Sequence, residues 1–207
     1  MSAKDTYTPP TLADYPQLTP EEIGRRFLKL VDSLKTFDDL TLEHIQEVMG
    51  LQMTPSPDPR RRFFNIYLPE SGWYYGLYYK DDPRSDRRNL VYEFNNRPAG
   101  QEHNEHYADM APVCGLDFHA YVAELEKMGF VEREDLAQYD SPMPPSIINA
   151  EGEVIGYEER RFFRLPGYTF TRDKVGVLIR ERRQTYTSEE EQPRFCVEAI
   201  SVGVRPE

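Results

Sequence analysis

Three runs rich in aromatic and β-branched residues constrain the fold of this chain more than any other feature. They occupy residues 62–68, 73–79 and 89–94. Turn-forming residues bound each run, at 69–72, 80–85 and 95–100. An antiparallel meander is the simplest arrangement of such runs. A second group of strands is expected at 154–165, 168–171, 175–183 and 195–204.

Helical signals precede the first group of strands. Thr19, Pro20 and Glu22 have the spacing of a capping box with proline at the first helical position. Apolar residues then follow at helical spacing, namely Ile23, Phe27, Leu30, Val31, Leu34 and Phe37. A second, shorter helix is expected from Leu42 to a stop at Gly50.

A third helix is expected between the two groups of strands, from a cap at Asp117 to Gly129. Residues 1–18 contain three prolines and little apolar periodicity, so they are expected to form an irregular arm. Residues 19–207 then form a single α+β domain, with antiparallel sheet and about three helices.

A short sequence motif occurs twice. Arg-Arg-Phe-Phe stands at 61–64 and at 160–163, each time followed by Leu-Pro and then a glycine-aromatic pair. A helix that ends in Met-Gly precedes both copies. The pattern allows two helix-plus-meander units at 19–100 and 101–207. Coincidence among short arginine-rich and aromatic words explains it as well.

The charge of the chain argues against nucleic acid as a partner. There are 36 acidic and 25 basic side chains, and binding to phosphates depends on Lys and Arg. Residues 101–159 alone hold 14 acidic and 2 basic side chains. This segment is either a solvated face that keeps the protein in solution or a docking surface for a basic partner.

Membrane insertion and export are not expected. No apolar run approaches the ~20 residues of a membrane helix, and the N-terminal residues lack the pattern of a signal peptide. Cys114 and Cys196 are too few and too far apart to indicate a disulfide framework or a structural zinc site. We expect a cytoplasmic protein in which Cys114 packs as a small apolar residue.

Motifs of catalysis are missing from the sequence. No G-x-S-x-G elbow, no G-x-G-x-x-G and no P-loop occurs. Potential metal ligands gather in one loop, at Glu102, His103, Glu105 and His106, with Cys114 and His119 nearby. Their spacing fits neither H-E-x-x-H nor H-x-x-E-H, and a solvated acidic loop is the better interpretation. We expect no enzyme, no metal and no cofactor.

Aromatic residues are most concentrated in the run 73–79. Strand alternation places Trp73, Tyr75 and Tyr79 on one face and Tyr74 and Tyr78 on the other. One face belongs to the core. The other is either covered by a helix or presents its tyrosines, and exposed tyrosine beside acidic groups suits a protein interface.

Several short sequence segments, spread over most of the chain, resemble those of one class of bacterial proteins. They are LTPEEIG at 18–24, DLTLEHI at 39–45, DMAPVCGLDF at 109–118, FTRDKVGV at 170–177, and Cys-Val at 196–197. In these words the chain resembles small cytoplasmic proteins encoded beside toxins of type VI secretion and Rhs polymorphic systems, which look like dedicated immunity proteins. None of the words is a catalytic signature.

The resemblance implies a protein that binds a cognate secreted toxin and neutralises it by covering its active site. An acidic surface suits a toxin with a basic cleft, since complementary charge raises the association rate and a few desolvated anchors supply affinity. The expected toxin-binding residues are Glu102, Glu105, Asp109, Glu124, Glu126, Glu132, Glu134, Asp135, Tyr139 and Asp140.

Two other classes of protein remain open. A non-catalytic adaptor or structural component of a secretion system would also be acidic, but it would not protect a cell from a toxin. A metal-dependent enzyme that uses the loop at 102–106 would hold a stoichiometric metal ion.

Overall fold

The computed structural model describes residues 8–82, 87–97, 108–133, 138–139, 146–148, 154–157, 166–183 and 195–204. The helices in these ranges are α1 (Pro20–Ser33), the 3-10 helix η1 (Phe37–Asp39), α2 (Leu42–Met49) and α3 (Phe118–Lys127). The strands are β1 (Thr54–Pro55), β2 (Arg61–Leu68), β3 (Trp73–Asp82), β4 (Arg87–Asn96), β5 (Val131–Glu132), β6 (Gln138–Tyr139), β7 (Ser146–Ile148), β8 (Val154–Tyr157), β9 (Pro166–Arg172), β10 (Val175–Arg183) and β11 (Phe195–Val204).

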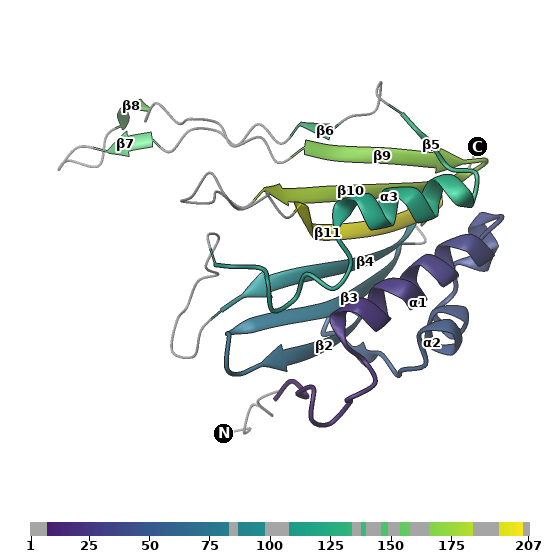
Figure 1. The fold of residues 1–207 in the computed structure, drawn as a ribbon, viewed down its shortest axis with the longest axis horizontal. Helices are drawn as coiled ribbons and strands as arrows, with labels where there is room; N and C mark the ends of the chain where they lie inside the picture. The colour runs from purple at the N-terminus through teal and green to yellow at the C-terminus, as the bar shows by residue number, and fades with distance from the viewer. Residues whose placement is uncertain are drawn as a thin grey trace.

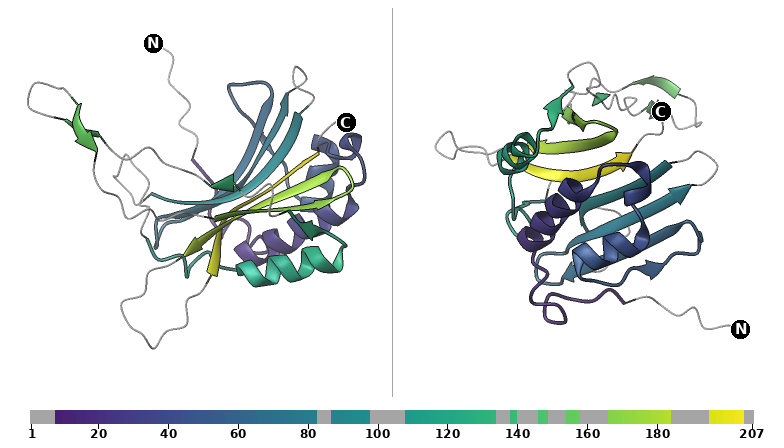
Figure 2. Two further views of the ribbon diagram at one scale, coloured as in Figure 1. Left: turned by 90° about the horizontal axis from the view of Figure 1, so that it is seen from above. Right: turned by 90° about the vertical axis from the view of Figure 1, so that its right-hand side faces the viewer.

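Antiparallel pairing joins most of these strands into one sheet of order β1-β2-β3-β4-β11-β10-β9-β5, and β6 also pairs with β9. Strands β2 to β4 form one meander and β9 to β11 form a second, and the two meet where β4 pairs with β11 (Figure 1). Helices α1, α2 and α3 all lie on one side of this sheet (Figure 2). The expected α+β class with antiparallel sheet is confirmed.

Helix α1 begins where the capping signal predicts. The Thr19 hydroxyl accepts a hydrogen bond from the Glu22 backbone N–H at 3.2 Å, and Pro20 stands in the first turn, where no N–H is needed. One face of the helix is buried against the sheet, through Ile23, Gly24, Phe27, Leu28, Leu30 and Val31. The apolar stripe read from the sequence is therefore the face that enters the core.

Helix α1 ends at Ser33, earlier than the apolar spacing out to Phe37 indicates. The cause lies in Asp39, whose carboxylate accepts hydrogen bonds from the backbone N–H groups of Lys35 at 2.8 Å and Thr36 at 2.7 Å. A side chain that binds these N–H groups withdraws them from the helical pattern. Phe37 consequently falls in the short 3-10 helix η1.

Arg172, the last residue of β9, binds the C-terminal ends of two helices. Its Nη2 donates to the carbonyls of Val31 at 3.2 Å, Asp32 at 3.0 Å and Leu34 at 3.1 Å, and its Nη1 donates to the Met128 carbonyl at 2.9 Å and the Asp32 carboxylate at 3.0 Å. The guanidinium carbon also lies 4.6 Å from the centre of the Phe130 ring. Because helix C-terminal ends carry unpaired carbonyls and partial negative charge, this one cation stabilises α1 and α3 together.

Helices α2 and α3 also have the expected ends. Thr41 and Asp117 each accept a hydrogen bond from the N–H three residues on, at 3.1 and 2.8 Å. Gly50 and Gly129 follow the helices with φ of 64° and 85°, in the left-handed region that favours glycine. No helix in the described part of the chain is long and apolar enough to cross a membrane.

The core lies between the helices and the sheet, and three of its tyrosines reach backbone carbonyls on the helical side. The Tyr75 hydroxyl donates to Leu18 at 2.9 Å, that of Tyr92 to Pro20 at 2.9 Å, and that of Tyr79 to Leu40 at 3.3 Å. Burial raises the pKa of Tyr79 to about 12, so its hydroxyl keeps the proton that it donates. Each ring thus adds apolar area to the core while its polar end is satisfied.

Cys114 and Cys196 form a disulfide, with their Cα atoms 5.5 Å apart. The expectation that these cysteines are unpaired, with Cys114 packing as a small apolar residue, is therefore wrong. The cysteines are 82 positions apart, and an antiparallel bridge between Asp117 and Cys196 brings the start of α3 beside β11. Sequence spacing does not reveal this approach because it depends on the placement of β11 in the middle of the sheet.

Gly76 of β3 occupies a position where a larger residue does not fit. A Cβ there would overlap the Asn65 side chain and the backbone carbonyl of Phe64. Gly76→Ala is therefore expected to lower the free energy of unfolding by about 2 kcal/mol, since the carbonyl cannot move without disturbing the pairing of β2 and β3. Urea denaturation measures this difference.

Gly176 provides the matched control, because a Cβ there would meet no atom closer than 3.7 Å. Gly176→Ala should leave the urea midpoint nearly unchanged. Equal losses in the two variants would contradict the steric explanation.

Residues 8–18 form an arm along the outer edge of β2. The Tyr67 N–H donates to the Pro10 carbonyl at 2.8 Å, and Leu18 at the end of the arm is fully buried. The arm therefore covers part of a sheet edge that otherwise exposes backbone groups.

The repeat remains a prediction, because its second Arg-Arg-Phe-Phe word at 160–163 lies outside the described residues. The strands expected at 175–183 and 195–204 are confirmed as β10 and β11. Two meanders joined edge to edge through β4 and β11 are one of the arrangements that a repeat allows.

Candidate functional site

The expected toxin-binding residues are only partly visible in the structure. Asp109, Glu124, Glu126 and Glu132 are described with their side chains, and Tyr139 is placed by its backbone in β6. Outside the described residues lie Glu102, Glu105, Glu134, Asp135 and Asp140.

The four described acidic residues do not form one patch. Asp109 lies near the start of β3, where its carbonyl accepts a hydrogen bond from the Trp73 indole at 2.8 Å. Glu124 and Glu126 lie on α3, and Glu132 follows that helix in the edge strand β5. Asp109 thus precedes α3, Glu124 and Glu126 lie in its C-terminal half, and Glu132 follows it, so only two of the four share one helix.

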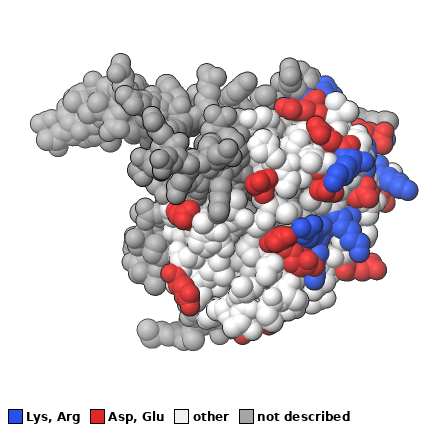
Figure 3. Space-filling model, viewed as in Figure 1, with Lys and Arg blue, Asp and Glu red and all other residues white. Residues whose placement is uncertain are grey.

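Basic side chains offset part of this acidic charge. Glu124 forms an ion pair with Lys127, and it also helps Glu21, the main cause, to raise the pKa of Arg25 on α1. On the helical side of the molecule, acidic and basic residues lie intermixed (Figure 3). The described part of this side is therefore a mixed surface, and the more acidic stretches of 101–159 are outside it.

Metal binding and thiol chemistry have little support among the described residues. No group of three or more His, Cys, Asp and Glu side chains there could hold a metal ion. The candidate loop at 102–106 lies outside the described ranges, so that prediction is untested. Cys114 is bonded to Cys196 and is not available as a thiolate nucleophile.

A cavity of about 250 Å³ lies between the start of α2 and the adjoining parts of β2, β3 and β4. Three arginines contribute to its lining, Arg60, Arg62 and Arg88, together with the carboxylates of Glu43 and Asp81. Three guanidinium groups around one cavity suggest an anion site.

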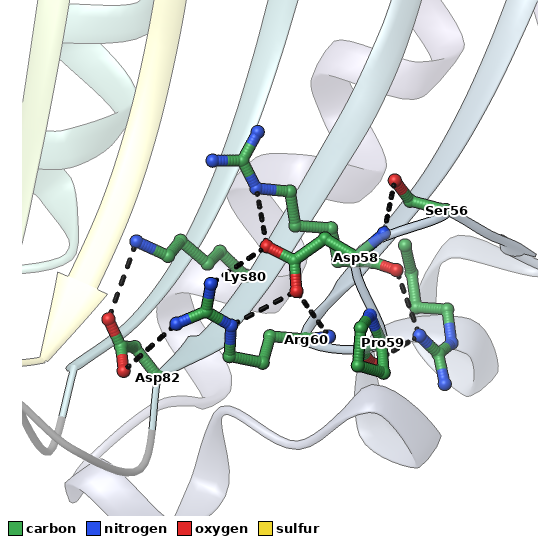
Figure 4. Close-up of polar contacts among 8 residues, drawn as sticks. Ser56, Asp58, Pro59, Arg60, Lys80 and Asp82 are labelled. Atoms are coloured by element: carbon green, nitrogen blue, oxygen red, sulfur yellow. Dashed lines mark hydrogen bonds and ion pairs between the residues drawn. The ribbon is translucent and has the colours of Figure 1, made fainter.

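The partners of these arginines argue against an anion site. Arg60 binds the Asp58 carboxylate through Nε and Nη2, both at 3.0 Å, within the network drawn in Figure 4. That contact is the main reason why the pKa of Asp58 falls to about 2. The Arg88 Nε atom lies 3.4 Å from a carboxylate oxygen of Asp81. The Arg62 guanidinium donates to the backbone carbonyls of Pro59 and Arg61. The cavity therefore presents little unbalanced positive charge, and we assign it no ligand.

The face of the sheet turned away from the helices carries aromatic side chains. Alternation along β3 is confirmed: Trp73, Tyr75 and Tyr79 are buried toward the helices, whereas Tyr74 and Tyr78 lie on the other face and are partly exposed. None of the described helices packs on that other face (Figure 2).

Four of these side chains come from two neighbouring strands. Phe63 and Tyr67 of β2 stand opposite Tyr78 and Tyr74 of β3. The rings of Tyr67 and Tyr74 stack, with their centres 4.4 Å apart. We call these four residues the aromatic face. Its stacked rings are held in place before any partner arrives, which limits the entropy that binding would cost.

Glu93 of β4 lies beside the aromatic face, between Gly76 of β3 and Ala199 of β11. Burial raises the pKa of its carboxyl group, and a hydrogen bond from the Asn95 amide at 3.0 Å partly opposes this rise. The site therefore combines a desolvated carboxyl group with aromatic rings. Glu93 was not among the candidate residues expected from the sequence; its alternation with Tyr92 and Phe94 in the third predicted strand was the available signal.

No protein-family model, no curated protein and no solved structure matches the chain.

Proposed function

We propose that this chain is an immunity protein that binds a protein toxin produced with it and blocks the toxin's active site. The observation that carries the proposal is the aromatic face, a partly exposed group of rings on a sheet face without a described helix. Tyrosines are enriched among the residues that dominate the energy of protein interfaces. The net charge of −11 and the likeness of its sequence words to immunity proteins support the same proposal.

In this proposal the two surfaces have different roles. The acidic segment 101–159 attracts a toxin with a basic cleft and raises the association rate. The aromatic face supplies the anchors that keep the complex together, because large rings bury much area at little cost in side-chain entropy.

The cysteines bear on the compartment in which the complex forms. The sequence led us to expect the cytoplasm, where thiols stay reduced. Disulfides persist instead in oxidising compartments, so the bond between Cys114 and Cys196 favours such a compartment. We therefore propose that this protein binds the toxin in an oxidising compartment, in which the Cys114–Cys196 bond is stable.

The test uses the toxin whose gene lies beside that of this chain. Producing the chain should protect cells from that toxin, and the purified proteins should form a complex. Tyr74→Ala combined with Tyr78→Ala is expected to weaken the complex about 30-fold or more, mainly through faster dissociation, as loss of interface anchors does. Surface plasmon resonance measures both rates.

Tyr15→Ala is the matched control, since Tyr15 is a tyrosine of the N-terminal arm that is 36% exposed. Reversing Glu102, Glu134, Asp135 and Asp140 to lysine together should slow association and reduce its salt dependence. Absence of protection would exclude an immunity protein and favour the secretion adaptor. Wild-type binding by the double tyrosine variant would exclude the aromatic face as the interface.

A further inference from the structure

One row of residues crosses the sheet on the face that carries the aromatic residues. The strand register places Asn65, Gly76, Glu93, Ala199 and Arg180 side by side on β2, β3, β4, β11 and β10. The two residues that flank Glu93 directly are thus a glycine and an alanine. Neither has a side chain that can pair with the Glu93 carboxylate.

Hydrogen-bond acceptors exceed donors around Glu93. Within the described chain, the one hydrogen bond to its carboxylate comes from the Asn95 amide at 3.0 Å. The Asn65 side-chain oxygen is buried against Gly76 and accepts no hydrogen bond from the described residues. Buried acceptors without a donor are unfavourable, and a donor from outside would relieve that cost.

The charged neighbours of Glu93 leave it without a close ion pair among the described residues. Burial is the main cause that raises the pKa of Glu93; the hydrogen bond from Asn95 and the charge of Arg180, two strands away, oppose this rise, and the charge of Glu198 adds to it. Arg180 is itself exposed to solvent. The carboxylate is consequently a place where an additional cation gains more than on a fully solvated surface.

Aromatic rings stand on both sides of this row. Tyr74 and Tyr78 lie two residues before and after Gly76 on β3, which makes them the diagonal neighbours of Glu93. Diagonal neighbours in a sheet are about 7–8 Å apart, within reach of side chains as long as tyrosine. The face of a tyrosine ring attracts cations.

We propose that Glu93, Asn65 and Asn95, flanked by Tyr74 and Tyr78, form the subsite that takes an arginine side chain of the protein partner. The inference rests on the proposed function, because it names the partner group that the aromatic face recognises. A guanidinium group fits better than an ammonium group: it is planar, stacks on aromatic rings and donates two parallel hydrogen bonds to a carboxylate.

The experiment needs no toxin. The isotope-labelled chain is titrated with N-acetyl-arginine methylamide while NMR shifts are recorded, and N-acetyl-citrulline methylamide, similar in shape but uncharged, is the control ligand. We expect saturable shifts at Tyr74, Tyr78 and Asn95 with the arginine compound only. Glu93→Gln should weaken this binding at least tenfold, whereas Glu47→Gln, at an exposed site on α2, should leave it unchanged.

Glu93→Gln is expected to fold, since it removes a charge that burial already disfavours. Equal shifts with citrulline, shifts scattered over the acidic surface, or full binding by the Glu93→Gln variant would each overturn the subsite. The proposed function fails separately, if the chain gives no protection from the toxin. Protection that persists in the Glu93→Gln variant with unchanged toxin affinity would overturn the subsite alone.

Discussion

Arg172→Met is expected to lower the free energy of unfolding by about 4 kcal/mol, because it removes the guanidinium that donates to carbonyls at the ends of two helices. Methionine keeps much of the aliphatic volume, so the loss reports mainly on the guanidinium. The Arg172 side chain is only 20% exposed. It donates to the backbone carbonyls of Val31, Asp32, Leu34 and Met128. Chemical denaturation measures the loss.

Two further variants separate the effect of the positive charge from the effect of the several hydrogen bonds. Arg172→Lys keeps the charge but cannot donate to several acceptors at once, so it should lose about half as much stability. Arg25→Met removes an arginine that is 62% exposed and paired with Glu21, and such solvent-exposed pairs contribute little to stability. A similar loss at both arginines would contradict the role assigned to Arg172.

Replacing Cys114 and Cys196 together by serine is expected to lower the free energy of unfolding by about 4 kcal/mol. The bond joins positions 82 apart, and closing a loop of that length reduces the entropy of the unfolded chain by about this amount in the chain-entropy model. Guanidinium denaturation of the two proteins measures the difference.

The reduced wild-type protein is the control, since it should unfold at the same denaturant concentration as the double serine variant. Alkylation of the denatured, unreduced protein checks the bond directly. Two reactive thiols per chain would contradict it. The same alkylation, carried out on intact cells, reports whether the protein resides in an oxidising compartment.

Local signals in the sequence predicted much of the fold. The caps at Thr19 and Asp117 and the glycine at 50 act within a few residues, so the sequence contains all of their determinants. Alternation in β3 likewise depends only on neighbours in the chain, and it correctly divided the aromatic residues between the two faces. The end of α1 was missed because the side chain of Asp39 competes for backbone N–H groups.

Features that depend on long-range pairing were not predictable in this way. The Cys114–Cys196 bond requires β11 to lie beside the start of α3, and the row through Glu93 requires the register of five strands. The acidic charge of segment 101–159 also does not form one acidic surface among the described residues. One reason is that Arg25, on another helix, lies near Glu124. The charge of a sequence segment follows from its residues alone, whereas the charge of a surface depends on which segments the fold brings together.

The pairing of β4 with β11 has a consequence for the synthesis of the protein. Glu93 pairs with Ala199, so the strand that lies beside β4 in the middle of the sheet comes from much later in the chain. Until the ribosome releases that strand, β4 has an unpaired edge, and unpaired edges promote association between chains. Contacts between such distant residues also slow folding. A nascent chain of this protein therefore depends on the later strand β11 to close an aggregation-prone edge of β4.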